Sequence, residues 1–128
     1  MESEQSSLFA IVNAPHQFNY ENGITLTYVE PGLTRGVLRA GPNSVNPEGN
    51  IHGGAIAALA DTAAGGDCVT SSCSIEYLRP AQGDLFCEAT PKKLGRKLSV
   101  IQVAVTDTAG KMVATGTFTF FMTRPGEA

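Results

Sequence analysis

The sequence has 128 residues and a mass of 13.4 kDa, enough chain for a single domain (residues 1–128) with a buried core. Hydrophobic residues make up 42% of it and charged residues 16%, which is typical of a globular protein whose exterior is partly covered by another subunit. The net charge of -3 argues against nucleic acid as the main partner, because binding a phosphate backbone requires a basic face.

The first seven residues, Met-Glu-Ser-Glu-Gln-Ser-Ser, are acidic and polar, unlike the basic and apolar start of a signal peptide. No apolar run approaches the roughly 18 residues that a membrane helix requires. Cys68, Cys73 and Cys87 are odd in number and form no Cys-x-x-Cys pair, which is typical of free thiols in a reducing compartment. We therefore expect a cytoplasmic protein with no membrane partner.

A short helix and two strands are predicted in the first third of the chain. Residues 5–14 favour the helix, which Pro15 would end. Residues 24–30 alternate apolar and polar side chains, which predicts a strand. Pro31 and the glycine after it predict a turn into a second strand at residues 34–40.

The strongest helix prediction covers residues 53–64, after a segment at residues 41–50 that is rich in Gly, Pro and Asn. Residues 55–60 are Ala, Ile and Leu only, so the helix has no polar face there and should be buried on most sides. The glycines at 65 and 66 provide a stop.

Four further strands are predicted at residues 69–78, 84–93, 97–107 and 111–122. The strand at 97–107 is apolar on both faces, so one face can pack on the helix and the other needs a cover, for which a second subunit is the economical candidate. Antiparallel strands that curve around one apolar helix bury it with the fewest residues. The predicted fold class is therefore α+β, with about six antiparallel strands around a central helix.

A polar loop leads into the N-terminus of the predicted helix, with the sequence Asn46-Pro-Glu-Gly-Asn-Ile-His52-Gly53-Gly54. The two final glycines let a ligand approach backbone N–H groups that have no helical partner. Such a terminus stabilises negative charge, on a phosphate or on the oxyanion formed when a thioester carbonyl is attacked. The alternative is that Gly53 and Gly54 only make a tight bend.

Asp61 interrupts the apolar part of the same helix. A carboxylate there loses hydration at a high cost unless it is paired or hydrogen-bonded, which makes it a candidate general base or nucleophile. The alternative is an acid near the helix end that meets solvent.

Gly53 and Asp61 are eight positions apart, roughly 12 Å along one helix axis. One helix therefore cannot bring both to one carbonyl, and joint action requires two antiparallel copies in a homodimer with two equivalent sites.

Four motifs resemble those of one family. The run Asn46-x-x-Gly49-x-x-His52-Gly53-Gly54, with Asp61 nine residues after the histidine, is similar to the signature of hotdog-fold acyl-CoA thioesterases of the phenylacetic-acid-degradation type. Similar motifs follow at Tyr77-Leu-Arg-Pro-Ala, Leu94-Gly-Arg-Lys-Leu and Val113-Ala-Thr-Gly-Thr-Phe. The resemblance covers about residues 20–122 in collinear order.

The resemblance implies hydrolysis of acyl-CoA thioesters with no cofactor, coenzyme A being part of the substrate. Asp61 would attack the thioester or activate the water that does, and the Gly53 N–H of the facing subunit would polarise the carbonyl. Asn46 and His52 would order the loop and hydrogen-bond near the carbonyl or the water, although loop fastening alone stays open for His52. Thr70 falls where such enzymes often carry a hydroxyl that positions the water, although its residue type alone favours an ordinary strand residue.

The segment between Asp61 and Thr70 is shorter than in related enzymes, since only nine positions separate the two residues. The helix must then end within about one turn of the acid, because a strand has to start before Thr70. We expect the acyl pocket beside the helix to be more open or differently shaped.

The stretch from Lys92 to Lys97 holds four of the nine basic residues. Coenzyme A carries a pyrophosphate and a 3′-phosphate, so an acidic protein that binds it needs a local cationic patch. Arg96 is the preferred phosphate contact, with Lys97, Arg79 and Gly54 as further substrate contacts. The alternative is a solvated hairpin turn. No metal is expected, since the two histidines lack ligand partners at metal-site spacing.

The sequence thus predicts a hotdog acyl-CoA hydrolase that is at least a homodimer, and the resemblance favours a homotetramer. The first alternative is a non-catalytic acyl-CoA-binding or sensing module, against which Asp61 argues. The second is a hotdog dehydratase or hydratase, whose His and acid arrangement the pattern from Asn46 to Asp61 does not match. The acyl group stays open among aryl, arylacetyl and medium-chain aliphatic acids.

Overall fold

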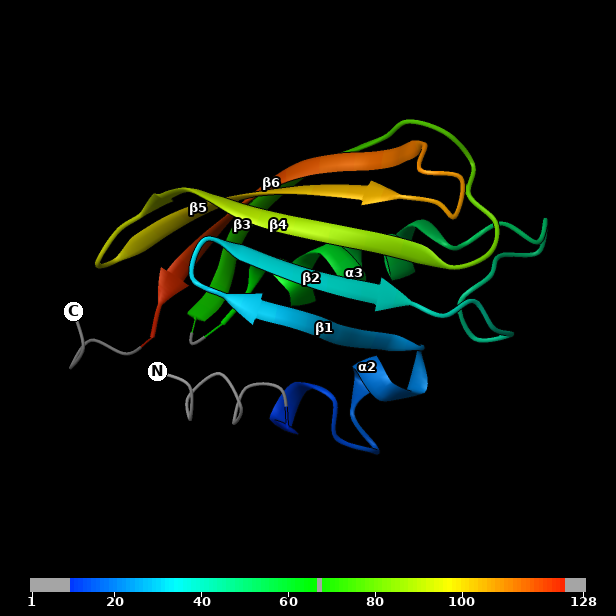
Figure 1. Ribbon diagram of the computed structural model, residues 1–128, viewed down its shortest axis with the longest axis horizontal. Helices are drawn as coiled ribbons and strands as arrows, with labels where there is room; N and C mark the ends of the chain where they lie inside the picture. Colours follow the sequence, from blue (N-terminus) through cyan, green and yellow to red (C-terminus); the bar gives the residue numbers. More distant parts are fainter. Residues whose placement is uncertain (1–9, 67, 124–128) are drawn as a thin grey trace.

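The computed structural model describes residues 10–66 and 68–123 of the chain. Within these ranges a twelve-residue helix and six strands form the body of the molecule, and a four-residue helix precedes them (Figure 1). In chain order the elements are α2 (Phe18–Glu21), β1 (Ile24–Glu30), β2 (Leu33–Leu38), α3 (Gly53–Ala64), β3 (Cys68–Tyr77), β4 (Leu85–Leu94), β5 (Leu98–Thr106) and β6 (Met112–Met122).

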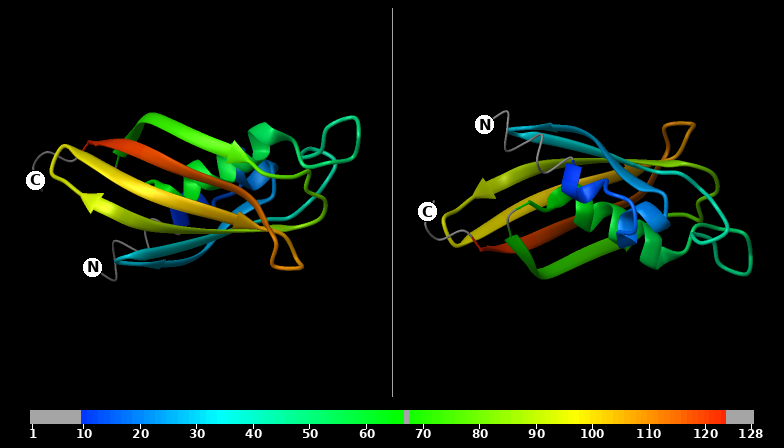
Figure 2. Two further views of the ribbon diagram at one scale, coloured as in Figure 1. Left: turned by 90° about the horizontal axis from the view of Figure 1, so that it is seen from above. Right: turned by 90° about the horizontal axis from the view of Figure 1, so that it is seen from below.

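The strands form one antiparallel sheet in the order β1-β2-β4-β5-β6-β3. The sheet curves around α3, which lies on its inner side, while the opposite face of the sheet is turned outward (Figures 1 and 2). This α+β arrangement of six strands around one helix is the hotdog fold, as the sequence predicts.

Apolar side chains from α3 and from the inner face of the sheet form the core. The fully buried residues of α3 recur at helical spacing and therefore lie on one side of it. They are Ile56, Leu59, Ala60 and Ala63. In β4 and β5 every second residue points inward. These inward residues include Leu85, Cys87, Ala89, Ile101, Val103 and Val105.

The sheet of one chain fully buries one side of α3, and the other side is half-buried in the single chain. Helical geometry places Ala57, Ala58 and Asp61 on the side away from the core, and all three are half-buried. The segment around α2 reaches the helix where the Thr62 hydroxyl donates to Asn19 Oδ1 at 3.1 Å. Seen from below, α3 lies open beside this segment (Figure 2).

Predicted and observed elements agree closely. The helix at residues 53–64 has the predicted bounds, and each strand begins and ends within two residues of its prediction. Of the helix predicted at residues 5–14, residues 10–12 are helical and residues 5–9 lie outside the described chain. The sequence pattern does not predict α2, a single turn after which the Asn22 side chain donates back to the carbonyl of Phe18 at 2.8 Å.

Candidate active site

The helix α3 begins at Gly53, with His52 in the N-cap position. The His52 carbonyl accepts hydrogen bonds from the Ala55 and Ile56 N–H groups at 2.9 and 3.1 Å, and its Nδ1 accepts one from the Gly54 N–H at 2.8 Å. A helix start leaves four N–H groups without helical partners. Three of them are bonded here, since the Gly54 and Ala55 N–H groups donate to His52 and the His52 N–H donates to the Ser44 carbonyl at 2.8 Å. The fourth, the Gly53 N–H, has no partner within the described part of the chain. His52 therefore fastens its loop, and the Gly54 N–H is engaged there.

Asn46 orders the loop before the helix. Its Oδ1 accepts hydrogen bonds from the Glu48 and Asn50 N–H groups at 3.1 and 3.0 Å, and its backbone bonds to Asn50 and Gly49. Gly49 has a φ of 85°, a conformation that favours glycine. The loop is therefore closed on itself, with the side-chain oxygen of Asn46 engaged inside it.

Asp61 is half-buried on α3, and its carboxylate is hydrogen-bonded. The Thr70 hydroxyl donates to Asp61 Oδ1, with 2.5 Å between the two oxygens. This bond joins the helix to the start of β3 and brings together two of the predicted site residues. The helix ends at Ala64, three residues after the acid, as the short spacing predicts.

A β-bulge lets β3 present two residues to α3. Side chains alternate along a regular strand, so Thr70 and Tyr77, seven positions apart, would lie on opposite faces. The register between β3 and β6 shifts by one residue at Ser71, which is therefore the extra residue of the bulge. As a result Thr70 pairs with the buried Phe120 and Tyr77 with the buried Ala114, and both face inward.

Tyr77 contacts the first residue of the helix, a contact that the sequence does not predict. Its hydroxyl donates to the Gly53 carbonyl oxygen at 3.2 Å. The ring lies over the glycine, since a Cβ on Gly53 would stand 3.6 Å from the ring Cε1. Simple alternation from Thr70 would turn Tyr77 outward, so only the bulge reveals its place.

An open depression of about 430 Å³ lies beside the Gly53 end of α3. Polar side chains from the loop, apolar side chains and the Tyr77 ring line it, together with Arg79. The lining residues are Asn46, Asn50, Ile51, Gly53, Ile56, Tyr77, Leu78, Arg79, Pro80 and Ala81. A small ligand could therefore reach the start of the helix from solvent.

Gly53 and Asp61 belong to one uninterrupted helix. Eight residues at the rise of an α-helix separate them by roughly 12 Å. The two groups do not converge within one chain, in agreement with the geometric argument from the sequence.

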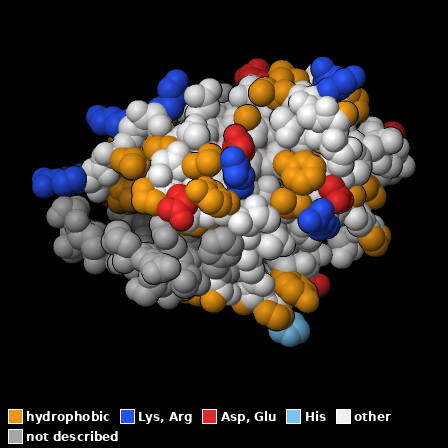
Figure 3. All heavy atoms as spheres, in the orientation of Figure 1, with side chains coloured by type: hydrophobic (Ala, Val, Ile, Leu, Met, Phe, Trp, Pro, Cys, Tyr) orange, Lys and Arg blue, Asp and Glu red, His pale blue; other side chains and the backbone are white. Residues whose placement is uncertain are grey.

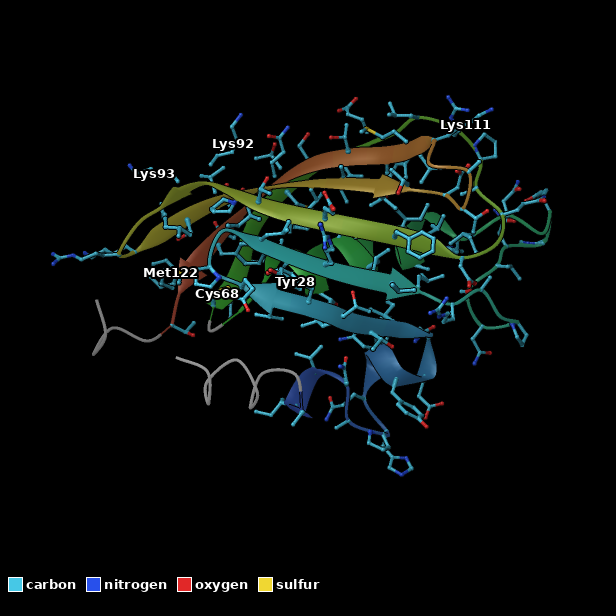
Figure 4. All side chains as sticks on the ribbon, in the orientation of Figure 1. Tyr28, Cys68, Lys92, Lys93, Lys111 and Met122 are labelled. Atoms are coloured by element: carbon cyan, nitrogen blue, oxygen red, sulfur yellow. The ribbon has the colours of Figure 1, made fainter. Side chains whose placement is uncertain are left out.

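The predicted phosphate contacts lie at two ends of the molecule. Arg96 and Lys97 are exposed in the β4–β5 turn, near the C-terminal end of α3 (Figure 1). Lys92 and Lys93 point away from the sheet near the same turn, where basic side chains stand out on the surface (Figures 3 and 4). Arg79 is exposed after β3, at the other end of α3. One chain alone does not bring these cations together.

Other titratable groups lie outside this site. The Ala40 N–H and the Arg39 guanidinium, 3.0 Å away, hold the pKa of Asp84 below its ordinary value. Burial in the core raises the pKa of Cys87 to about 12, so this thiol stays protonated and inert at neutral pH.

No helix in residues 10–66 and 68–123 is both long and apolar enough to span a bilayer. Over the same two ranges, His, Cys, Asp and Glu side chains form no group of three or more that could hold a metal ion.

The fold and the site define a class, namely hotdog-fold proteins with a candidate catalytic acid on the central helix. The sequence profile of the thioesterase superfamily matches residues 48–114, just over half of the chain. The protein belongs to the thioesterase superfamily.

Individual relatives agree with this assignment. A protein from Halobacterium salinarum that carries the provisional name of an esterase is 34% identical over 70 residues, 45% of this chain. The match spans 46% of that relative, so the chain covers about half its length. A mutant of the phenylacetic acid degradation protein PaaI from Thermus thermophilus is 28% identical, with a TM-score of 0.77 over 83% of this chain and 98% of that chain. A Streptococcus mutans protein solved bound to acetyl CoA is 30% identical, with a TM-score of 0.74 over 87% of this chain and 97% of that chain.

Proposed function

We propose that the protein hydrolyses acyl-CoA thioesters to a free acid and coenzyme A. The observation that carries this proposal is the Asp61 carboxylate, held by the Thr70 hydroxyl on a helix whose first N–H, that of Gly53, has no partner among the described residues. Thioester hydrolysis needs a base or nucleophile and a donor that stabilises the oxyanion. Membership of the thioesterase superfamily, and the acetyl CoA bound to the Streptococcus mutans relative, support this substrate class.

Asp61 acts by one of two routes. As a nucleophile it forms an anhydride with the acyl group, which water then cleaves; as a general base it takes a proton from the water that attacks the carbonyl carbon. In both routes the C–S bond breaks, coenzyme A leaves as a thiol, and water supplies the new oxygen of the acid. The Gly53 N–H donates to the carbonyl oxygen as negative charge develops there. Thr70 orients the carboxylate or the water, while His52 and Asn46 hold the loop.

Two subunits complete each site, with Asp61 of one facing Gly53 of the other. Two surfaces of the single chain support this: the half-buried side of α3, and the edge strand β3, of which eight of ten residues are exposed. Thr70 lies beside the acid and Tyr77 beside the glycine. Antiparallel pairing of two β3 edges, with Thr70 opposite Tyr77 of the partner subunit, would unite the two halves. The family resemblance favours a dimer of such dimers.

The same arrangement gathers the cations that one chain keeps apart. Arg79 of the partner subunit would lie on the glycine side of the shared site, and Arg96 and Lys97 on the acid side. The pyrophosphate and the 3′-phosphate of coenzyme A would contact these side chains. Gly54 would keep the helix start free of a side chain where the pantetheine arm passes.

The test is the release of free thiol from a panel of aryl-, arylacetyl- and medium-chain acyl-CoAs. The variants are Asp61→Asn and, as a matched control, Glu30→Gln, which removes an exposed acid at the end of β1, away from the proposed interface. We expect turnover by the wild type and by the control, and a loss of about 10³-fold or more in kcat for Asp61→Asn. Unchanged turnover in Asp61→Asn would show that Asp61 is not the catalytic acid. If the wild type released no thiol from any substrate of the panel, the proposal of an acyl-CoA hydrolase would be wrong.

A non-catalytic acyl-CoA-binding module is the second candidate. The observation that favours it is the engagement of His52 Nδ1 and Asn46 Oδ1 within their own loop, which leaves neither atom free for a substrate. For such a module, calorimetry would show tight acyl-CoA binding with the same affinity in the wild type and in Asp61→Asn. The thiol-release assay would show no turnover.

A further inference from the structure

Tyr77 holds the residue at which α3 begins. Its hydroxyl donates to the Gly53 carbonyl oxygen at 3.2 Å, and its ring Cε1 and Cζ atoms lie 3.6 and 3.7 Å from where a Cβ of Gly53 would stand. The residue is 53% exposed and also lines the open depression beside the helix. Tyr77 therefore touches both the backbone of the helix start and the space that a ligand would enter.

The first turn of α3 needs such support. Consecutive glycines have more backbone freedom than other residues, and helix ends fray. His52 holds the turn through the Gly54 N–H, and Tyr77 holds it through the Gly53 carbonyl. A carbonyl oxygen has two lone pairs, so the bond from Tyr77 does not displace a hydrogen bond of the helix itself. Both bonds hold the planar peptide unit that joins Gly53 to Gly54, directly after the Gly53 N–H, and so they fix the orientation of the residue that carries this N–H.

We infer that Tyr77 is a positioning residue for the Gly53 N–H, an inference that rests on the proposed function. The hydroxyl acts on the substrate carbonyl only through the place and direction of that N–H. A misplacement of about 1 Å in such a group can cost about 10²-fold in rate. The hydroxyl therefore contributes to kcat, whereas the ring, as a wall of the depression, contributes to substrate binding.

A purely structural role for the hydroxyl makes a different prediction. Removing only the hydroxyl of Tyr77 keeps the whole ring and its apolar packing, so the fold should persist. The informative variant is Tyr77→Phe, which keeps the ring. The matched control is Tyr28→Phe, because Tyr28 is 40% exposed on β1 and contacts Arg35.

The first measurement does not depend on turnover. In ¹⁵N-labelled full-length protein, we expect Tyr77→Phe to shift the Gly53 and Gly54 amide resonances and to speed the hydrogen exchange of the hydrogen-bonded Gly54 amide about tenfold. Tyr28→Phe should leave both amides as in the wild type. Unchanged Gly53 and Gly54 amides in Tyr77→Phe would overturn the inference.

The second measurement separates kcat from KM with the best acyl-CoA of the panel. We expect Tyr77→Phe to lower kcat about 5- to 20-fold with KM within about twofold of the wild type. Tyr77→Ala, which also removes the ring, should raise KM as well. An unchanged kcat in Tyr77→Phe, or a change in KM alone, would overturn the inference.

The two measurements keep the inference distinct from the proposed function. If the wild type released no thiol from any acyl-CoA, the hydrolase would be wrong, and the amide measurement would still decide whether Tyr77 fixes the Gly53 N–H. If the wild type hydrolysed acyl-CoA and Tyr77→Phe had the same kcat, the proposed hydrolase function would be supported and the inferred role of Tyr77 would be wrong.

Discussion

Thr70 donates a hydrogen bond to Asp61 and so ties the edge strand to the central helix. We expect Thr70→Val, which keeps the shape of the side chain without its hydroxyl, to lower kcat in the thiol-release assay about 10- to 100-fold. Thr70→Ser should retain most of the activity. The control is Thr117→Val, because Thr117 is exposed on the outer face of β6. Full activity of Thr70→Val would mean that the carboxylate works without this bond.

The Gly53 N–H can be deleted with little change to the helix. Proline is favoured at the first helical position, and His52, with φ -62° and ψ 136°, already has the extended conformation that a residue before proline requires. We expect Gly53→Pro to fold and to lose about 10²- to 10³-fold in kcat. Gly53→Ala keeps the N–H and should stay within about tenfold of the wild type, since its Cβ would only contact the Tyr77 ring. Circular dichroism checks that both variants are folded. Equal kcat values for Gly53→Pro and Gly53→Ala would contradict the role of this N–H.

Mixed dimers test whether the site is shared. A dimer of one Gly53→Pro subunit and one Asp61→Asn subunit has one complete site and one doubly defective site if the groups come from different chains. An equal mixture, refolded together, should recover about one quarter of wild-type turnover, because about half of its dimers are mixed. If both groups came from the same chain, every site would be defective, so a mixture without activity contradicts the shared site.

Coenzyme A phosphates should reveal which cations bind them. We expect Arg96→Ala and Arg79→Ala to raise KM for acyl-CoA about three- to tenfold, since both side chains are exposed and their charge is screened by solvent. Hydrolysis of the matching acyl-pantetheine, which has no phosphate, should not change. Lys111→Ala, at an exposed residue just before β6, is the control (Figure 4). An equal rise in KM for acyl-CoA and for acyl-pantetheine would show that the two arginines do not act by contacting the phosphates.

The buried thiol predicts how stability depends on pH. Burial, with a smaller contribution from Glu88, raises the pKa of Cys87 from 9.0 to about 12. Above pH 9.0 the unfolded chain releases the thiol proton and the folded chain keeps it, so stability is complete below this pH and falls above it. The loss approaches about 1.4 kcal/mol per pH unit.

Chemical denaturation of the wild type and of Cys87→Ala between about pH 8 and pH 11 checks this dependence. The variant should be less stable at neutral pH by about 1–2 kcal/mol, because a buried sulfur is removed. Its stability should then fall less steeply than that of the wild type above pH 9.0. Parallel curves would contradict the raised pKa of this thiol, since the other groups titrate alike in both proteins.

Elements with a strong local pattern could be predicted from the sequence. The alanine-rich run gives α3 its bounds because glycines stand at both of its ends and nothing polar but Asp61 and Thr62 interrupts it. Strand alternation also predicts β1 to the residue. The rise per residue is the same in every α-helix, so the distance between Gly53 and Asp61 follows from the sequence once the helix is predicted.

Features that depend on tertiary contacts could not be predicted. The bulge at Ser71 is set by the pairing of β3 with β6, and no local residue pattern predicts it. For this reason the sequence names Thr70 from family resemblance alone and misses Tyr77 as a contact of the helix. The sequence also does not distinguish the alanines of α3 that the sheet fully buries from those that are half-buried in the single chain.

The extra residue in β3 also limits how this part of the chain can change in length. Deleting Ser71 would remove the bulge and leave Thr70 and Tyr77 six positions apart in a regular strand, so both side chains would still face inward. Inserting one residue between these two, with the bulge kept, would instead place them on opposite faces of the sheet. A single deletion that removes the bulge therefore preserves both orientations, whereas a single insertion does not, so insertions should fall instead in exposed turns such as residues 108–110.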